Sequence, residues 1–125
     1  MLALLERRVA FEVPRPPSRR RMTYEISTTQ DGTAQLAIKG ELDAMSVSDL
    51  RSDIDGLVSR QPNRVEVDLS RLRMIDSSGV GALVSLYKRI RAQGGHVVVM
   101  GLQDQPLAVF RLLRLDRVMT GTDGA

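Results

Sequence analysis

Two adjacent serines, Ser77 and Ser78, are the residues of this sequence best placed to carry chemistry. They follow Asp76, which stands at the N-cap position of a predicted helix, so both fall in its first turn. Backbone N–H groups of a first helical turn lack intrahelical partners, and with the helix dipole they favour anions. A phosphate on one of these hydroxyls is therefore compatible with the fold. The alternative is that both serines are unmodified helix-start residues.

Two glycines accompany the serines, Gly79 in the first turn and Gly81 just beyond it. A glycine costs a helix interior about 1 kcal/mol relative to alanine. Their presence indicates that bulk is unwelcome at this end of the helix. The close approach of a partner backbone is one explanation.

Signatures of catalysis are weak by comparison. Asp43, Asp68 and Asp76 follow predicted strands and could hold Mg²⁺, as in a magnesium-dependent enzyme, but aspartates after strands are common as caps and turns. His96, the only histidine, lies at a predicted strand start and is expected to be structural. The sequence has no G-x-S-x-G, P-loop or G-x-G-x-x-G motif. We therefore expect a binding protein with no catalytic residue, metal or cofactor.

The elements that must position these residues alternate between strands and helices. Apolar alternation predicts strands over 23–28 and near 36–38 around an Asp31-Gly32 turn, over 64–69 before a polar turn, over 96–100, and a short one over 116–120. Helical spacing predicts a helix capped by Asp43 or Ser46 that ends before Pro62, a second from Asp76 to Gly94, and a third starting at Pro106.

This order favours an α/β fold. Alternating strands and helices imply parallel strands joined by right-handed crossovers, and the initial hairpin adds an antiparallel piece. We expect a single domain over residues 22–120, with a mixed, mainly parallel β-sheet, helices packed mainly on one face, and a frayed tail at 121–125.

The first 21 residues differ from the rest in composition. They hold six arginines, two glutamates and three of the five prolines, so this leader carries a net charge of +4 and the remainder −1. We interpret residues 1–21 as a disordered leader or a mis-assigned start, because Met22 opens the first alternating segment. Apolar residues precede the arginines, the reverse of a secretory signal. An Arg-rich tail that binds anionic surfaces is the alternative.

Composition excludes several other classes. The chain of 125 residues has the length of one domain, and no apolar run approaches the roughly 20 residues of a membrane-spanning helix. The sequence pI of about 9.9 does not indicate nucleic-acid binding, because the part after the leader is nearly neutral. The absence of cysteine rules out disulfides and thiolate sites. Cytoplasm is the expected compartment.

The segment around the serines resembles the STAS domain family, and within it the bacterial anti-sigma factor antagonists. The family's D-S-[ST]-G-[LV]-G motif matches the run from Asp76 to Gly81. Gly40-Glu41-Leu42-Asp43 is similar to the family's G-E-L-D, and Asp68-Leu69-Ser70 resembles the strand end before the serine loop. The resemblance extends over about residues 23–120 in element order and spacing. The two motifs together are more specific than either alone.

The resemblance implies a mechanism called partner switching. The unmodified antagonist binds an anti-sigma factor, typically a serine kinase, and thereby frees a sigma factor; phosphorylation ends the complex and a serine phosphatase restores it. The matching positions imply phosphorylation at Ser77 and partner binding by Gly40, Glu41, Asp43, Asp76, Ser77, Ser78, Gly79 and Val80. The chain would then be a kinase substrate that contacts neither nucleic acid nor membrane directly.

The family also contains an alternative function. Some stand-alone STAS domains are subunits of membrane lipid-transport ATPase assemblies, in which phosphorylation is not central. Many relatives continue into a final amphipathic helix beyond the point where this chain ends, so we expect its last elements to be more exposed.

Overall fold

The computed structural model describes residues 7–11 and 22–120, and its centre is one five-stranded sheet in the order β1-β2-β3-β4-β5. The antiparallel pairs are β1–β2 and β2–β3, and the parallel pairs are β3–β4 and β4–β5. The mixed sheet predicted from the order of elements is therefore confirmed. The strands are β1 (Arg7–Phe11), β2 (Met22–Thr28), β3 (Thr33–Leu42), β4 (Arg64–Ile75) and β5 (His96–Met100).

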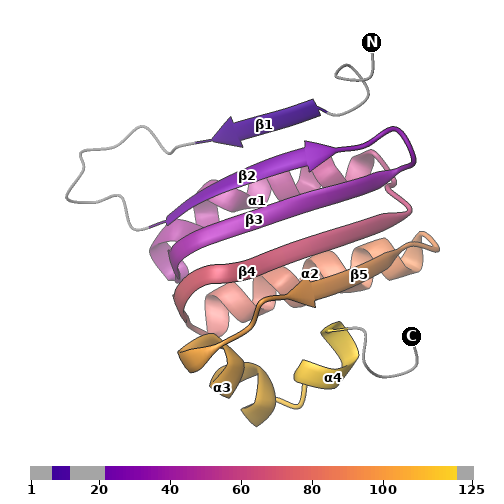
Figure 1. The fold of residues 1–125 in the computed structure, drawn as a ribbon. Helices are drawn as coiled ribbons and strands as arrows, with labels where there is room; N and C mark the ends of the chain where they lie inside the picture. Colours follow the sequence, from indigo (N-terminus) through magenta and orange to yellow (C-terminus); the bar gives the residue numbers. More distant parts are fainter. Residues whose placement is uncertain (1–6, 12–21, 121–125) are drawn as a thin grey trace.

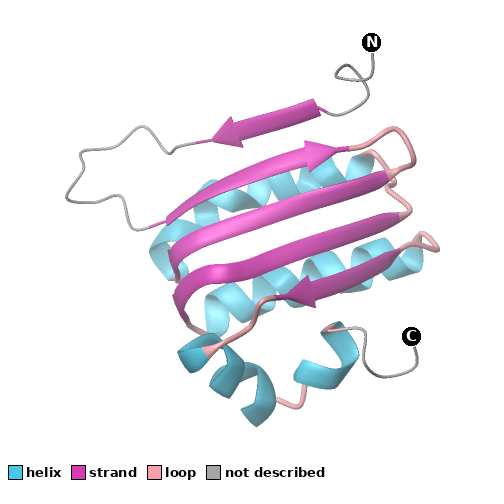
Figure 2. Ribbon diagram, viewed as in Figure 1, coloured by secondary structure: helices cyan, strands magenta, loops and turns pink. Residues whose placement is uncertain are grey.

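The helices form a layer behind the sheet. The longest two lie next to each other on one face, whereas the last two lie by the β5 edge (Figures 1 and 2). This confirms the predicted α/β class. The helices are α1 (Ala44–Ser59), α2 (Ser77–Ala92), α3 (Asp104–Leu112) and α4 (Asp116–Met119). Among the described residues, none of these helices has the length and apolar character needed to cross a bilayer.

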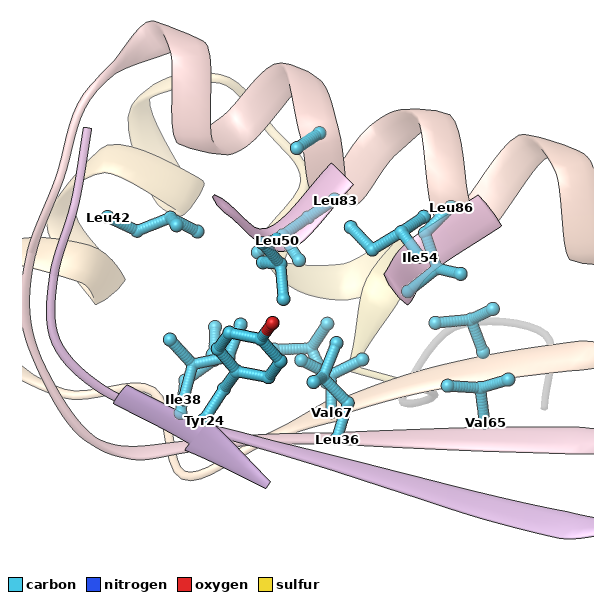
Figure 3. Packing of buried hydrophobic residues seen from close by; sticks show 14 of the residues in the cluster. Tyr24, Leu36, Ile38, Leu42, Leu50, Ile54, Val65, Val67, Leu83 and Leu86 are labelled. Atoms are coloured by element: carbon cyan, nitrogen blue, oxygen red, sulfur yellow. The ribbon is translucent and has the colours of Figure 1, made fainter. Parts of the chain in front are cut away.

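The core lies between the sheet and the helix layer. Alternate residues of β3 and β4 point inward and meet the apolar stripes of α1 and α2 (Figure 3). The Tyr24 ring stands among them, and its hydroxyl donates to the Asp49 carbonyl at 3.2 Å and to the Asp53 carboxylate. Burial, and then the Asp53 carboxylate, raise the pKa of Tyr24. Besides Tyr24, the core residues labelled in Figure 3 are Leu36, Ile38, Leu42, Leu50, Ile54, Val65, Val67, Leu83 and Leu86.

Strand β4 corrects the predicted turn after Leu69. The strand continues to Ile75, and its 12 residues pair with the 10 of β3, with register shifts opposite Ala37–Lys39 and Gly40–Glu41. Such bulges place two residues opposite one, so the strict alternation of inward and outward side chains is lost. Leu69, Leu72 and Ile75 are all buried although they are spaced three positions apart, a spacing that strict alternation does not give. The alternation of apolar and polar residues therefore stops near Leu69, although the strand itself continues to Ile75.

The C-terminal elements correct two further predictions. Helix α3 begins at Asp104, two residues before the predicted start, so Pro106 lies inside its first turn, where a missing N–H is tolerated. The strand predicted over 116–120 is wrong, because Asp116–Met119 forms the short helix α4. Its buried Met119 faces the core, and one apolar contact of this kind does not distinguish a helical turn from a short strand.

The leader also departs from the disordered interpretation. Residues Arg7–Phe11 form strand β1, which pairs antiparallel with β2 from Arg7 opposite Thr28 to Phe11 opposite Tyr24. The prediction of disorder is therefore wrong for these five residues. Residues 1–6, 12–21 and the predicted tail at 121–125 lie outside the described residues. The hypothesis that translation begins at Met22 stays a prediction.

Candidate functional site

The candidate site lies where β3 and β4 end. The carboxyl ends of parallel neighbouring strands share one edge of a sheet, and here each strand leads directly into a helix. The first turns of α1 and α2 consequently lie beside each other at that edge (Figure 1). The segment around Asp43 and the segment around Ser77, far apart in the sequence, thus form one surface.

Helix α1 begins with a complete capping box. The Asp43 carboxylate accepts hydrogen bonds from the backbone N–H groups of Met45 and Ser46, each at 3.0 Å. In return, the Ser46 hydroxyl accepts from the Asp43 N–H at 3.0 Å and donates to the Glu41 carbonyl at 2.9 Å. Both residues predicted as alternative caps therefore act together, Asp43 as the N-cap and Ser46 as its partner.

Helix α2 begins at a cap that also reaches α1. One oxygen of the Asp76 carboxylate accepts from the Gly79 N–H at 3.0 Å, and the other accepts from the Ala44 N–H at 3.2 Å. The Asp76 N–H donates to the Leu42 carbonyl at 3.1 Å. A single carboxylate therefore holds the N-termini of both helices together. The predicted N-cap role of Asp76 is confirmed.

Ser77 is the first residue of α2 and is exposed. Because Asp76 supplies the cap, the Ser77 hydroxyl is not required for that role. Ser78 is half-buried. The exposed Ser77 side chain is accessible to another protein. It lies at the positive end of the helix dipole, where a phosphate is favoured.

The two glycines of α2 differ in what surrounds them. A Cβ on Gly79 would lie 2.6 Å from the Leu42 carbonyl oxygen and 2.8 Å from the Ile75 side chain. Internal packing therefore requires Gly79, and the approach of a partner is the wrong explanation for it. At Gly81 no described atom other than its chain neighbours and the nearby backbone of its own helix lies within 4 Å of such a Cβ, and the residue is exposed. For Gly81, an approaching partner stays a prediction.

Two more of the predicted partner-binding residues lie inside the fold. Gly40 is buried in β3 with a φ of 100°, at the second register shift against β4. A left-handed φ favours glycine, so this residue is explained by the bulge. Val80 is 6% exposed and belongs to the core. Gly40, Gly79 and Val80 therefore shape the site from within, whereas Glu41 and Asp43 are half-buried and reach its surface.

The three aspartates of the magnesium hypothesis do not assemble. Asp68 instead accepts a hydrogen bond from the Ser70 N–H at 2.9 Å, a local turn contact, while Asp43 and Asp76 cap helices. Within residues 7–11 and 22–120, no group of three acidic or histidine side chains is arranged to hold a metal ion.

Comparison with known proteins identifies the fold. A family model described as "Mlab, STAS domain" matches residues 27–121. The chain belongs to the STAS domain family.

Several anti-sigma factor antagonists resemble this chain over most of its length. The anti-sigma-B factor antagonist of Staphylococcus aureus is 24% identical over 98 residues, covering 78% of this chain and 91% of that protein. The structure of the unphosphorylated anti-sigma factor antagonist SpoIIAA has a TM-score of 0.67 at 22% identity, covering 74% of this chain and 82% of that one. The Bacillus cell fate determinant SpoIIAA in its phosphorylated form has a TM-score of 0.63 at 22% identity, covering 74% and 84%.

This STAS domain also exposes two methionines, on α1 and on β4, which the sequence did not single out. Met45, in the first turn of α1, is 70% exposed, and Met74, near the end of β4, is 50% exposed. Met45 falls outside the predicted helical stripe, and Met74 falls in the segment predicted as a turn. The sequence signal that could have identified them is a large apolar residue at a position where the predicted pattern expects an exposed side chain. Beside them, Arg73 forms an exposed ion pair with Glu41 at 3.4 Å.

Proposed function

We propose that this protein is an anti-sigma factor antagonist that binds an anti-sigma factor through the first turns of α1 and α2, and that phosphorylation of Ser77 ends the complex. The observation that carries the proposal is the exposed position of Ser77 at the start of α2, beside the start of α1. The names of similar proteins support it, including a SpoIIAA structure in phosphorylated form.

The proposed contact surface has an apolar part and an acidic part. Met45 and Met74 supply exposed apolar area that a partner can cover. The carboxylates of Asp43 and Asp76 accept hydrogen bonds from backbone N–H groups, so the positions of these two side chains are fixed. Flexible methionines next to a rigid helix start suit recognition of another protein. The role is therefore binding rather than catalysis.

The effect of phosphorylation follows from charge. A phosphate adds about −1.5 to −2 charges. In the free protein it lies at a helix N-terminus, which favours it by typically 0.3 to 1 kcal/mol, so the fold persists. In a complex the same charge must lose water next to the Asp76 carboxylate. A penalty of about 3 kcal/mol lowers affinity roughly a hundredfold.

We infer two partners for the chain, an anti-sigma factor and a phosphatase. The anti-sigma factor is a serine kinase that phosphorylates Ser77, and a serine phosphatase removes the phosphate. The sigma factor is released when the anti-sigma factor is occupied. In this cycle the chain is the substrate of the kinase, and it competes with the sigma factor for binding to the anti-sigma factor.

The direct test is phosphorylation in solution. The purified protein is incubated with ATP and each candidate anti-sigma kinase of its genome, and the phosphosite is mapped by mass spectrometry. We expect modification at Ser77 in the natural sequence and in Ser78→Ala, which serves as the matched control, and none in Ser77→Ala. Modification confined to Ser78 would contradict the assignment.

Affinity for the same kinase completes the test. We expect Ser77→Ala to bind like the natural sequence, and Ser77→Asp to bind about tenfold or more weakly while its unfolding midpoint is unchanged. A carboxylate carries less charge than phosphate, so the loss is smaller than the hundredfold estimated for phosphate. Equal affinity of the two variants for a confirmed partner would overturn the switch.

A second candidate function is a subunit of a lipid-transport ATPase assembly. It is favoured by the description of the matching family model, which does not name a sigma regulator. In that case the protein would copurify with an ATPase, and Ser77→Asp would leave this association intact. If instead the natural sequence copurifies with a serine kinase and the Ser77→Asp variant does not, the result supports the first function.

A further inference from the structure

Within residues 7–11 and 22–120, no strand pairs with the C-terminal part of β4 on its β5 side. Strand β5 pairs with β4 only from Arg64 to Asp68, so the remainder of β4, up to Ile75, has β3 alone as a paired strand. The chain that follows β5 lies against this edge instead. A Cβ on Gly101 would lie 2.8 Å from the Ser70 backbone nitrogen, and the Gln103 side chain donates to the Ser70 carbonyl at 2.8 Å.

Gln105, in the first turn of α3, takes the place of a paired strand at Ile75. Its side-chain nitrogen donates to the Ile75 carbonyl at 3.0 Å, and its side-chain oxygen accepts from the Ile75 N–H at 2.9 Å. A primary amide offers the same donor and acceptor as a peptide group. Both contacts are partly buried. Glutamate at this position lacks the donor, and alanine lacks both groups.

Ile75 directly precedes the candidate switch residues. The next residue, Asp76, is held from the opposite side, by its N–H to the Leu42 carbonyl at 3.1 Å and by its carboxylate to the Ala44 N–H at 3.2 Å. The segment that carries Ser77 is thus held between the end of β3 with α1 on one side and α3 on the other.

We propose that Gln105 is a positioning residue for Ser77: by binding both backbone groups of Ile75, it fixes the serine segment in the geometry that the kinase and the partner recognise. This inference rests on the proposed function of Ser77. Gln105 touches neither Ser77 nor a reacting group and acts through Ile75. Proximity and orientation of a hydroxyl govern the rate of a transfer reaction more than they govern binding of the surrounding surface.

The first test needs no partner. Amide hydrogen exchange is measured in the natural sequence, Gln105→Ala and Gln105→Glu, with Gln103→Ala as the matched control that removes only the contact to Ser70. We expect exchange at the Ile75 amide to accelerate about tenfold or more in Gln105→Ala, with the Val98 amide of β5, which faces β4, unchanged. Unchanged protection of Ile75 would overturn the proposal.

The glutamate variant separates positioning from simple packing. At neutral pH its carboxylate accepts from the Ile75 N–H but repels the Ile75 carbonyl. Below the ordinary glutamate pKa of about 4.3 the protonated carboxyl both donates and accepts, as the amide does. We therefore expect the Ile75 protection factor of Gln105→Glu to rise towards that of the natural sequence at about pH 4. Protection that stays low in acid would count against the paired contact.

The second test uses the kinase that phosphorylates Ser77 in the natural sequence. We expect Gln105→Ala to lower kcat for Ser77 phosphorylation about tenfold with KM changed less than twofold, and Gln103→Ala to match the natural sequence. A natural kcat in Gln105→Ala would overturn the role of Gln105 alone. No phosphorylation of the natural sequence by any candidate kinase would overturn the proposed function, and the positioning role with it.

Discussion

The starts of α1 and α2 use the same type of cap in different ways. Both follow a strand, and both have an aspartate in extended backbone as N-cap. At α1, the side chain of Asp43 satisfies N–H groups within its own turn, and Ser46 completes the exchange. At α2, the Asp76 carboxylate is divided between its own helix and Ala44 of the other.

This difference indicates at which helix start a modification can affect distant parts of the structure. At the start of α1 the capping box joins residues within a few positions of one another, so a change in Asp43 or Ser46 acts mainly on that turn. The long-range contact described there is that of the Ala44 N–H with Asp76. The start of α2 depends on Leu42, Ala44 and Gln105, which lie elsewhere in the sequence. The exposed serine lies at the second kind of start. A change at Ser77 therefore has contacts through which it can influence both α1 and α3.

The largest expected effect is that of Gly79→Ala. The new methyl group would lie 2.6 Å from the Leu42 carbonyl oxygen, a backbone atom that cannot rotate away. Overpacking of this kind costs typically 1 to 3 kcal/mol, and we expect a loss of about 2 kcal/mol in the free energy of unfolding. Urea unfolding followed by circular dichroism measures it. Stability equal to that of the natural sequence would show that the two helix starts can separate freely.

The next effect is that of Asp76→Ala. It removes an N-cap, worth about 0.5 to 2 kcal/mol, and also the acceptor of the Ala44 N–H, so we expect a loss of about 1.5 kcal/mol. Nuclear magnetic resonance should show shifts of the amide signals of both Gly79 and Ala44. If only the Gly79 signal moves, the carboxylate does not join the helices in solution.

A smaller effect is expected for Asp43→Ala, the matched change at α1. The capping box is lost, but the contacts are local, so we expect a loss of about 1 kcal/mol. The amide signals of Met45 and Ser46 should shift, whereas that of Gly79 should not. An equal shift at Gly79 would mean that the two starts are coupled in both directions, against the contrast drawn above.

The smallest effect, of opposite sign, is expected for Gly81→Ala. The position is open and exposed, so alanine should raise the free energy of unfolding by about 0.5 to 1 kcal/mol. If the partner lies close to this part of α2, its affinity should fall in the same variant, as isothermal titration with the confirmed kinase would measure. Unchanged affinity would place the contact surface at the first turns only.

Much of the fold followed from patterns that one element carries within itself. The β2–β3 hairpin, α1, α2 and β5 were predicted because each shows its own periodicity and its own turn or cap residues. The end of β4 was missed because its bulges break the period, and α4 because one buried residue has no period. Strand β1 was missed because its structure consists of pairing with β2, a non-local contact.

The candidate site divides in the same way. The sequence alone indicated that Asp76 caps one helix, that Asp43 or Ser46 caps the other, and that Ser77 stands at a helix start, because capping depends on residues a few positions apart. Only the tertiary structure decided that the two starts share one carboxylate, that Gly79 is confined by Leu42, and that Gln105 binds Ile75. These contacts join segments brought together by parallel strand pairing, and no local spacing encodes their distances.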